Sequence, residues 1–245
     1  MNEKAITPTQ RKQEEFNEAM ARYHRTGRYA WVYVWVSFLN VAMQVVLLVI
    51  AMSLDISIFS FILALFIAYF VTDFINGLVH MYMDNNDNYT SIWGPFIASF
   101  HLHHKTQKYK TSNVFFIYFN ESGSKFWLVA YLVVVGLLCF GNVSPLLLMI
   151  LIMIGILSSV AEVSHYLCHN STSKIVSILQ KYRLLLPMCH HHVHHEQDNV
   201  SYAFLNGTSD ILLDKIAAKL YKGYGNGTDK HFETYEGIGT FNRKK

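Results

Sequence analysis

The residues best suited to chemistry in this sequence are its histidines. There are 13 in 245 residues, and five of them fall within six positions of the segment PMCHHHVHHEQDN, 187–199. All but two histidines lie in four clusters. These are His80, then His101, His103 and His104, then His165 and His169, and last His190, His191, His192, His194 and His195. Because neutral imidazole binds Fe, Cu, Zn and Ni, the clusters indicate a transition-metal site.

The spacing within the clusters suits metal binding by helices. His165 and His169 are four residues apart, and residues at that spacing share one helix face. The same spacing recurs in three further pairs, namely His80 with Asp84, His190 with His194, and His191 with His195. Adjacent histidines such as His103 and His104 point about 100° apart on a helix, so one cluster can supply two ions. So many imidazoles need at least two ions.

Three carboxylates accompany the histidines. Asp84 is a candidate ligand or a partner of a ligand, because it shares a helix face with His80. Asp73 lies seven residues before His80, and Glu162 lies three residues before His165. Acidic residues inside apolar segments are costly and usually functional. Since metal-bound histidines usually donate their second N–H to a carboxylate or carbonyl, Asp73 and Glu162 are candidates for orienting the imidazoles.

The rest of the chain is too apolar for a typical soluble domain. It is 52% hydrophobic and 15% charged, whereas soluble domains carry about 25% charged residues. Apolar runs that predict membrane-spanning helices, the third of them short, cover 29–54, 56–79, 126–140 and 145–163. All 20 Lys and Arg residues lie in 1–28, in 84–125 or after residue 170. The positive-inside rule therefore predicts that both termini and the middle loop are cytosolic.

This topology brings the clusters to one depth. About 20 residues cross the hydrocarbon, so the second span emerges near Gly77 and the fourth near Ser164. His80 and His165 then lie together just beyond the cytosolic boundary. A single histidine at a membrane boundary is usually an ordinary polar residue, and a histidine run can be a metal-scavenging tract. Four clusters at one depth favour a dedicated metal site over both alternatives.

The sequence thus predicts an all-α integral membrane protein with four transmembrane helices and a cytosolic, histidine-rich helical cap. The predicted organisation is an N-terminal amphipathic helix in 1–28, a four-span domain with a di-metal site in 29–222, and a polar tail in 223–245. Apolar residues at helical spacing predict amphipathic helices in 9–25, 173–186 and 209–221. Such helices lie on the membrane surface or pack within the cap.

Four segments together, DFINGLVH…D, FHLHH, HYLCH and HHHVHH…SYAFLNG, resemble the plasmanylethanolamine desaturase family, also called Kua or CarF. They are also similar to the related plant desaturase that puts a trans double bond at position 3 of palmitate on phosphatidylglycerol. The resemblance runs from about Asp73 to Ile216. It implies two irons held by eight histidines on the cytosolic face of a four-span domain. By motif, the ligands are His80, His103, His104, His165, His169, His191, His194 and His195.

Some positions match this pattern only in part. Asp84 matches, and His190 matches only the plasmanyl-type members. His101 and His192 fall outside the pattern. Met81 stands where the family usually has Trp, and KTQKYKTSN follows His104 where the family tends to have a proline and a TIT-like stretch. These departures bear on the lipid substrate more than on the metal.

The resemblance implies O2-dependent desaturation of a lipid chain. In the preferred interpretation, an ether-linked alkyl chain loses two hydrogens beside its oxygen and becomes the vinyl ether of a plasmalogen. In the close alternative, the acyl chain of a glycerolipid is desaturated. The segments HMYMDN and FHLHHK favour the plant-type enzyme, whereas the pair His190 and His191 favours the plasmanyl type. An alternative of another class is a non-catalytic membrane metal-binding scaffold or regulator.

The implied partners are a membrane phospholipid and an external electron donor, either a b-type cytochrome or a ferredoxin, that docks on the basic cytosolic face. The chain has no haem motif, no flavin fingerprint and no Fe–S cysteines of its own. Its three cysteines form no CxxC pair, and Cys189 is either a soft ligand beside the histidine run or a buried thiol. Nothing indicates a nucleic-acid partner. The expected location is the bacterial inner membrane or the endoplasmic reticulum.

Overall fold

A computed structural model describes residues 8–105, 110, 112–197 and 199–221, and the regular structure in those ranges is entirely helical. The polar tail predicted in 223–245 lies outside the described residues. The elements are α1 (Pro8–Arg25), α2 (Arg28–Met52), α3 (Ile58–Asn85), α4 (Gly94–Lys105), α5 (Val114–Glu121), the 3-10 turn η1 (Ser122–Ser124), α6 (Phe126–Leu138), α7 (Pro145–Asn170), α8 (Lys174–Lys181), α9 (Met188–Glu196) and α10 (Asp210–Leu220).

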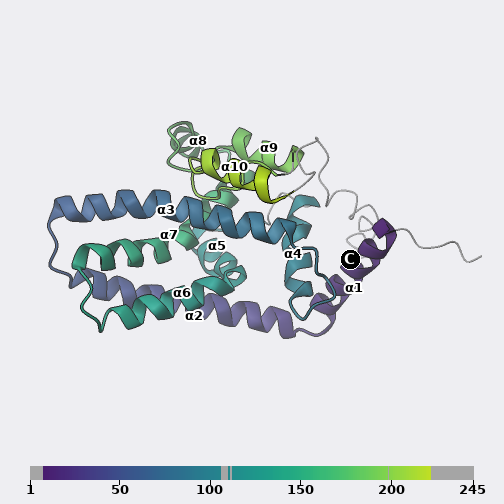
Figure 1. Ribbon diagram of the computed structural model, residues 1–245, viewed down its shortest axis with the longest axis horizontal. Helices are drawn as coiled ribbons and strands as arrows, with labels where there is room; N and C mark the ends of the chain where they lie inside the picture. The colour runs from purple at the N-terminus through teal and green to yellow at the C-terminus, as the bar shows by residue number, and fades with distance from the viewer. Residues whose placement is uncertain (1–7, 106–109, 111, 198, 222–245) are drawn as a thin grey trace, which may run out of the picture.

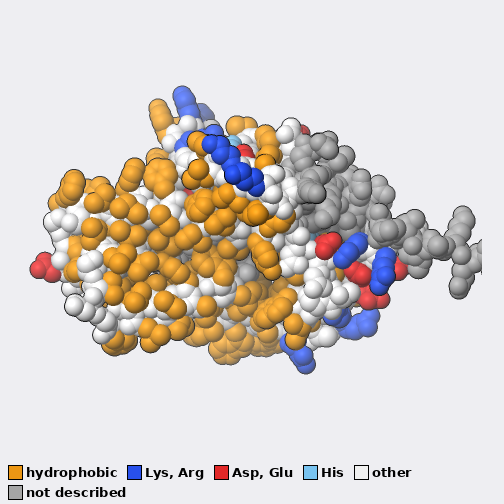
Figure 2. All heavy atoms as spheres, viewed as in Figure 1, with side chains coloured by type: hydrophobic (Ala, Val, Ile, Leu, Met, Phe, Trp, Pro, Cys, Tyr) orange, Lys and Arg blue, Asp and Glu red, His pale blue; other side chains and the backbone are white. Residues whose placement is uncertain are grey.

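Helices α2, α3, α6 and α7 run side by side along the longest axis of the molecule (Figure 1). Their shared core contains Leu47, Ala64, Leu132 and Ile152, all of which are buried. The outward surface of this bundle is also apolar, and hydrophobic side chains cover most of the face shown in Figure 2. Basic side chains gather instead at one end and on α8–α10. A helix that is apolar on all sides is typical of a membrane span.

Three helices, α2, α3 and α7, are long and apolar enough to cross a membrane. The third predicted span is not one straight helix. Helix α6 has 13 residues, and a helix of that length is only about 20 Å long. The segment α5–η1 precedes it across a bend of 93°, and the bent pair counts as a fourth span if it is taken as one unit.

Buried side chains from α2 stabilise this bend. The backbone of Lys125 leaves the helical region, with φ −94° and ψ 67°, so nearby carbonyl groups lose their helical partners. Asn40 donates from Nδ2 to the carbonyls of Ser122 at 2.9 Å and Lys125 at 3.1 Å. An amide side chain thus supplies the hydrogen bonds that the broken helix lacks, which the hydropathy of 126–140 does not predict.

The helices predicted outside the spans are present. Helix α1 agrees with the prediction for 9–25 and packs on α4. In the segment before α4, Tyr89 meets Phe16 of α1 edge to face at 5.3 Å. Helix α10 agrees within one residue with 209–221. The helix predicted for 173–186 is shorter, because the chain turns at Arg183, whose φ is +57°. Helices α8, α9 and α10 lie beside the C-terminal half of α3, which contains His80 (Figure 1).

Candidate metal centre

Nine residues form two adjacent groups that could hold metal ions. The five-histidine group contains His103, His165, His169, His191 and His195. The aspartate group contains His80, Asp84, His104 and His194. In each group the ligand atoms all lie within 4.8 Å of one another. All eight histidines that the resemblance implied as ligands are therefore brought together, and Asp84 joins them.

In the five-histidine group the Nε2 atoms face one another. Helix α7 supplies His165 and His169, one turn apart, whose Nε2 atoms are separated by 3.2 Å. Helix α9 supplies His191 and His195, again one turn apart, with Nε2 atoms 3.1 Å apart. The two helices meet where His165 Nε2 lies 2.8 Å from His191 Nε2. Helix α4 completes the group, since His103 Nε2 lies 3.2 Å from His169 Nε2.

The aspartate group is arranged around one buried carboxylate. Asp84 Oδ2 lies 3.1 Å from His80 Nε2 and 3.2 Å from His194 Nε2. Asp84 Oδ1 lies 3.1 Å from His104 Nε2. The neighbours His103 and His104 belong to different groups, as their divergence on a helix predicts.

The second nitrogen of two of these imidazoles is held by the backbone. His80 donates from Nδ1 to the carbonyl of Tyr202 at 2.8 Å, and His194 donates from Nδ1 to the carbonyl of Val200 at 2.9 Å. Carbonyl oxygens only accept, so the neutral form of each ring carries its lone pair on Nε2. These lone pairs point at the carboxylate of Asp84. A cation between them would remove this repulsion, so the arrangement fits a metal with carbonyl-oriented imidazole ligands.

Burial keeps the imidazoles of α4 and α9 neutral, which is the form that can bind a metal. Burial lowers the pKa of His103, His191 and His195 well below the usual value, and the neighbouring histidines lower it further. The pKa of His194 is also lowered by burial, although the nearby Asp84 opposes the shift. A lowered pKa leaves the ring neutral near pH 7, and only neutral imidazole can donate a lone pair to a metal.

Asp73 orders the loop that covers both groups. Its side chain is buried, and its Oδ1 accepts from the backbone N–H of Leu205 at 3.0 Å and of Asn206 at 2.9 Å. Its Oδ2 accepts from the backbone N–H of Ser209 at 3.0 Å and from the Ser209 hydroxyl at 2.7 Å. In the described residues Asp73 therefore holds a loop rather than an imidazole.

That loop places an aromatic ring against both groups. The ring of Phe204 lies 4.2 Å from the ring of His80 and stacks on His165 at 4.4 Å. No sequence pattern predicted a role for Phe204, Tyr202 or Val200. The only signal for them was the segment SYAFLNG, which follows the histidine run.

The remaining candidates have other partners. Glu162 pairs with Lys125, with 2.8 Å between Oε1 and Nζ, instead of contacting a described histidine. His190 Nε2 lies 2.6 Å from Asp210 Oδ2, outside both groups. Cys189 lies outside both groups and is exposed. It is therefore neither part of the candidate ligand set nor a buried thiol, the two alternatives predicted for it.

His101 and His192 also lie outside the two groups. His101 donates from Nε2 to the carbonyl of Met83 at 2.8 Å, and its Nδ1 lies 2.7 Å from the Tyr89 hydroxyl. It therefore ties α4 to the end of α3. His192 is exposed and lies 3.0 Å from Glu196.

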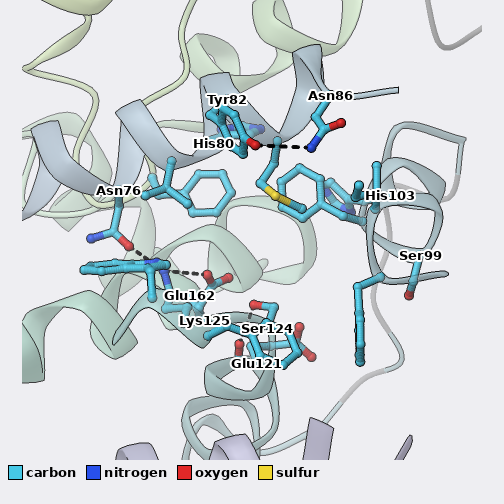
Figure 3. Close-up of a pocket in the computed structure, with 18 of the residues that line it drawn as sticks. Asn76, His80, Tyr82, Asn86, Ser99, His103, Glu121, Ser124, Lys125 and Glu162 are labelled. Atoms are coloured by element: carbon cyan, nitrogen blue, oxygen red, sulfur yellow. Dashed lines mark hydrogen bonds and ion pairs between the residues drawn. The ribbon is translucent and has the colours of Figure 1, made fainter. Parts of the chain in front are cut away.

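A cavity of about 500 Å³ adjoins the two groups. His80 and His104 of the aspartate group and His103 and His165 of the five-histidine group line it. Most of its other lining side chains are apolar or aromatic, with a polar region formed by Asn76, Glu121, Ser124, Lys125 and Glu162. Figure 3 shows Lys125 directed toward Asn76 and Glu162, across the cavity from His80.

Comparison with known proteins identifies a domain over most of the chain. A family model described as a lipid desaturase domain matches residues 69–222. This range contains every residue of both groups. No curated protein and no solved structure matches the chain.

Proposed function

Since the chain belongs to the lipid desaturase family, we propose that it is a membrane-bound, O2-dependent di-iron desaturase. The observation that carries the proposal is the pair of imidazole-rich groups beside one largely apolar cavity. Imidazole-rich sites with few carboxylates suit iron and disfavour magnesium or calcium. An apolar cavity suits a lipid chain.

The proposed ligands of one iron are the five-histidine group, and those of the other are His80, Asp84, His104 and His194. A bound di-iron centre supplies the O2 chemistry that no protein side chain can perform on an unactivated C–H bond. The protein orients the ligands through the carbonyls of Tyr202 and Val200. The apolar cavity wall excludes water from the reacting chain.

The proposed substrate is a phospholipid with an ether-linked alkyl chain, as in plasmanylethanolamine. The carbon pair beside the ether oxygen loses two hydrogens and becomes a vinyl ether. O2 takes up these hydrogens together with two electrons and two protons, and two waters result. The electrons come from an external donor, either a b-type cytochrome or a ferredoxin. Desaturation of an acyl chain on a glycerolipid is the alternative within the same chemistry.

The proposed topology has four spans, with α5–η1–α6 as the bent third span and both termini in the cytosol. All of the Lys and Arg residues lie before α2 or at its first residue, between α3 and α6, or after α7, as the positive-inside rule requires. The donor then docks on the basic cytosolic face. The location is the bacterial inner membrane or the endoplasmic reticulum.

A second candidate function, a non-catalytic metal-binding scaffold or regulator, uses the same two groups without turnover. The cavity beside the groups favours the enzyme, because a scaffold has no need of space for a lipid chain. A scaffold alters no lipid.

Expression in cells that lack plasmalogens, followed by lipid mass spectrometry, tests the enzyme. We expect an acid-labile vinyl ether with the wild type and none with His165→Ala, which removes an Nε2 from the centre of the five-histidine group. His192→Ala, at an exposed position outside both groups, is the matched control and should keep full activity. A new acyl double bond in place of a vinyl ether would select the alternative substrate, and an unchanged lipid profile would select the scaffold.

A further inference from the structure

The polar region of the cavity contains a buried ammonium group that the mechanism above does not use. Lys125 is 5% exposed and immediately precedes α6, at the bend of the proposed third span. Its Nζ lies 2.8 Å from Glu162 Oε1 and donates a short hydrogen bond to Asn76 Oδ1. An ammonium group has three protons. The two acceptors recorded among the described residues leave one proton for a ligand in the cavity.

This ammonium group lies close to both metal-binding groups. Lys125 Nζ is 5.8 Å from the centre of the Phe204 ring, and that ring is 4.2 Å from the ring of His80. The two steps together cover at most about 10 Å, and the route to His165 is of similar length. A ligand atom bound at Lys125 is therefore only a few carbon–carbon bonds from the metal-binding groups.

The charges in the cavity indicate which kind of atom binds there. The charged residues that line it, apart from the histidines, are Lys125, Glu121 and Glu162. The cavity wall contains two carboxyl groups and one ammonium group, so it has no excess positive charge for a phosphate. A neutral acceptor, such as an ether, ester or hydroxyl oxygen, can take the remaining proton without repulsion from Glu162. Hydrogen bonds from charged donors are stronger than those between neutral groups.

From this geometry we propose that Lys125 binds the oxygen that links the reacting chain to glycerol. Glu162 and Asn76 hold the ammonium group in place, and the bound oxygen sets which carbon pair faces the metal-binding groups. The inference rests on the proposed function, since it takes a lipid as the occupant of the cavity. Lys125 is then a specificity-determining residue, because it places the first carbons of the chain, and not its middle, at the site of oxidation.

The contrasting explanation is that the ion pair only joins α6 to α3 and α7. The layer of buried polar side chains around it offers a matched control. Gln44 on α2 donates from Nε2 to the carbonyl of Gly155 at 2.9 Å and to Ser159 Oγ at 2.8 Å. It is buried in the same bundle but does not line the cavity. Replacing Gln44 disturbs helix packing without touching a ligand.

A competition experiment separates the two explanations. Metal-loaded protein is purified in detergent without O2 and mixed with equal amounts of two phospholipids. They differ only in the linking atom of one chain, which is an ether oxygen in one and a methylene in the other. Lipid that stays bound through gel filtration is quantified by mass spectrometry. We expect the wild type and Gln44→Met to prefer the ether lipid by about tenfold or more, and Lys125→Met to retain both lipids equally.

Equal retention by the wild type, or an unchanged preference in Lys125→Met, would overturn the proposal. If Lys125→Met does not fold because Glu162 is left unpaired, Lys125→Met combined with Glu162→Gln removes both charges and gives the same comparison. The measurement needs no turnover. A failure of the desaturase assignment therefore shows in the lipid profile of expressing cells, whereas a failure of this proposal shows only in the binding preference.

Discussion

Asp84 makes the two proposed metal-binding groups chemically different. Five neutral imidazoles form one group, whereas a carboxylate facing three imidazole nitrogens forms the other. A negatively charged ligand lowers the net charge of a metal site and favours a higher oxidation state at that ion. We expect the two proposed sites to differ in affinity as well, because only the aspartate group offers a cation a carboxylate.

Asp84→Asn should therefore empty one site and spare the other. The amide keeps the size of the side chain but turns an N–H₂ group toward nitrogen lone pairs, so the cation loses its one anionic ligand. We expect bound iron to fall from about two per chain to about one. Elemental analysis of purified protein measures this. Asp87→Asn, at a half-exposed neighbouring position, is the control. Full iron content in Asp84→Asn would remove Asp84 from the ligands.

The buried histidines predict how stability depends on pH. Burial lowers the pKa of His103, His191 and His194 from the usual 6.5, so the unfolded chain binds more protons than the folded one below that pH. The contribution of these rings to the free energy of unfolding of the metal-free protein is then fully present above about pH 6.5. It is lost as the pH falls, by up to about 1.4 kcal/mol per histidine and pH unit.

The midpoint of thermal unfolding in detergent with a chelator measures this slope. It should fall steadily between about pH 7 and pH 5. His191→Gln should make the slope shallower by removing one buried ring, whereas His192→Gln, at an exposed position, should leave it unchanged. A midpoint that is constant over this range would contradict the assignment of these rings as buried and neutral.

At the scale of elements, the two groups depend on a loop whose described residues belong to neither group. The segment between α9 and α10 supplies the carbonyls that orient His80 and His194, and it also supplies the ring of Phe204. Asp73 on α3 fixes the loop through its backbone N–H groups. The link from Asp73 to the two groups is therefore indirect, through loop backbone, and not through an imidazole N–H.

Asp73→Asn should weaken both the fold and the metal centre. The new N–H₂ group would face backbone donors, so one set of hydrogen bonds is lost in a fully buried position. We expect a loss of roughly 2–4 kcal/mol in the free energy of unfolding. A lower thermal midpoint and reduced iron content check this together. Asp55→Asn, exposed in the turn between α2 and α3, should change neither. Normal iron content in Asp73→Asn would mean that the loop does not orient the ligands.

For the whole molecule, the number of spans decides on which side of the membrane each terminus lies. Three long helices alone would put the termini on opposite sides, whereas a bent fourth span in α5–η1–α6 puts them on the same side. The location of the histidine groups supports the second arrangement, because α3 and α7 end together at those groups.

Single cysteines introduced into a cysteine-free variant can decide this. Arg11→Cys in α1 and Lys215→Cys in α10 should react with a membrane-impermeant maleimide from the same side in sealed vesicles. Asp55→Cys should react only from the other side. Reaction of the α1 and α10 cysteines from opposite sides would mean that the chain crosses the membrane three times. Labelling after detergent treatment controls for accessibility.

Local sequence patterns determined much of this protein. The i, i+4 spacing of His165 with His169 and of His191 with His195 follows from the helical repeat, and so does the divergence of His103 from His104. The lengths of apolar runs predicted α2, α3 and α7. These features can be predicted without knowledge of tertiary contacts, because each depends only on residues within one helix.

Only the tertiary structure decided which histidine joins which group, because that depends on the relative rotation of α3, α4, α7 and α9. It also decided the place of Lys125. By sequence Lys125 is one of the charges in a loop, yet the bend before α6 turns it inward to Glu162, 37 positions away in the chain. Contacts between distant segments arise from packing, and a local pattern contains no information about them.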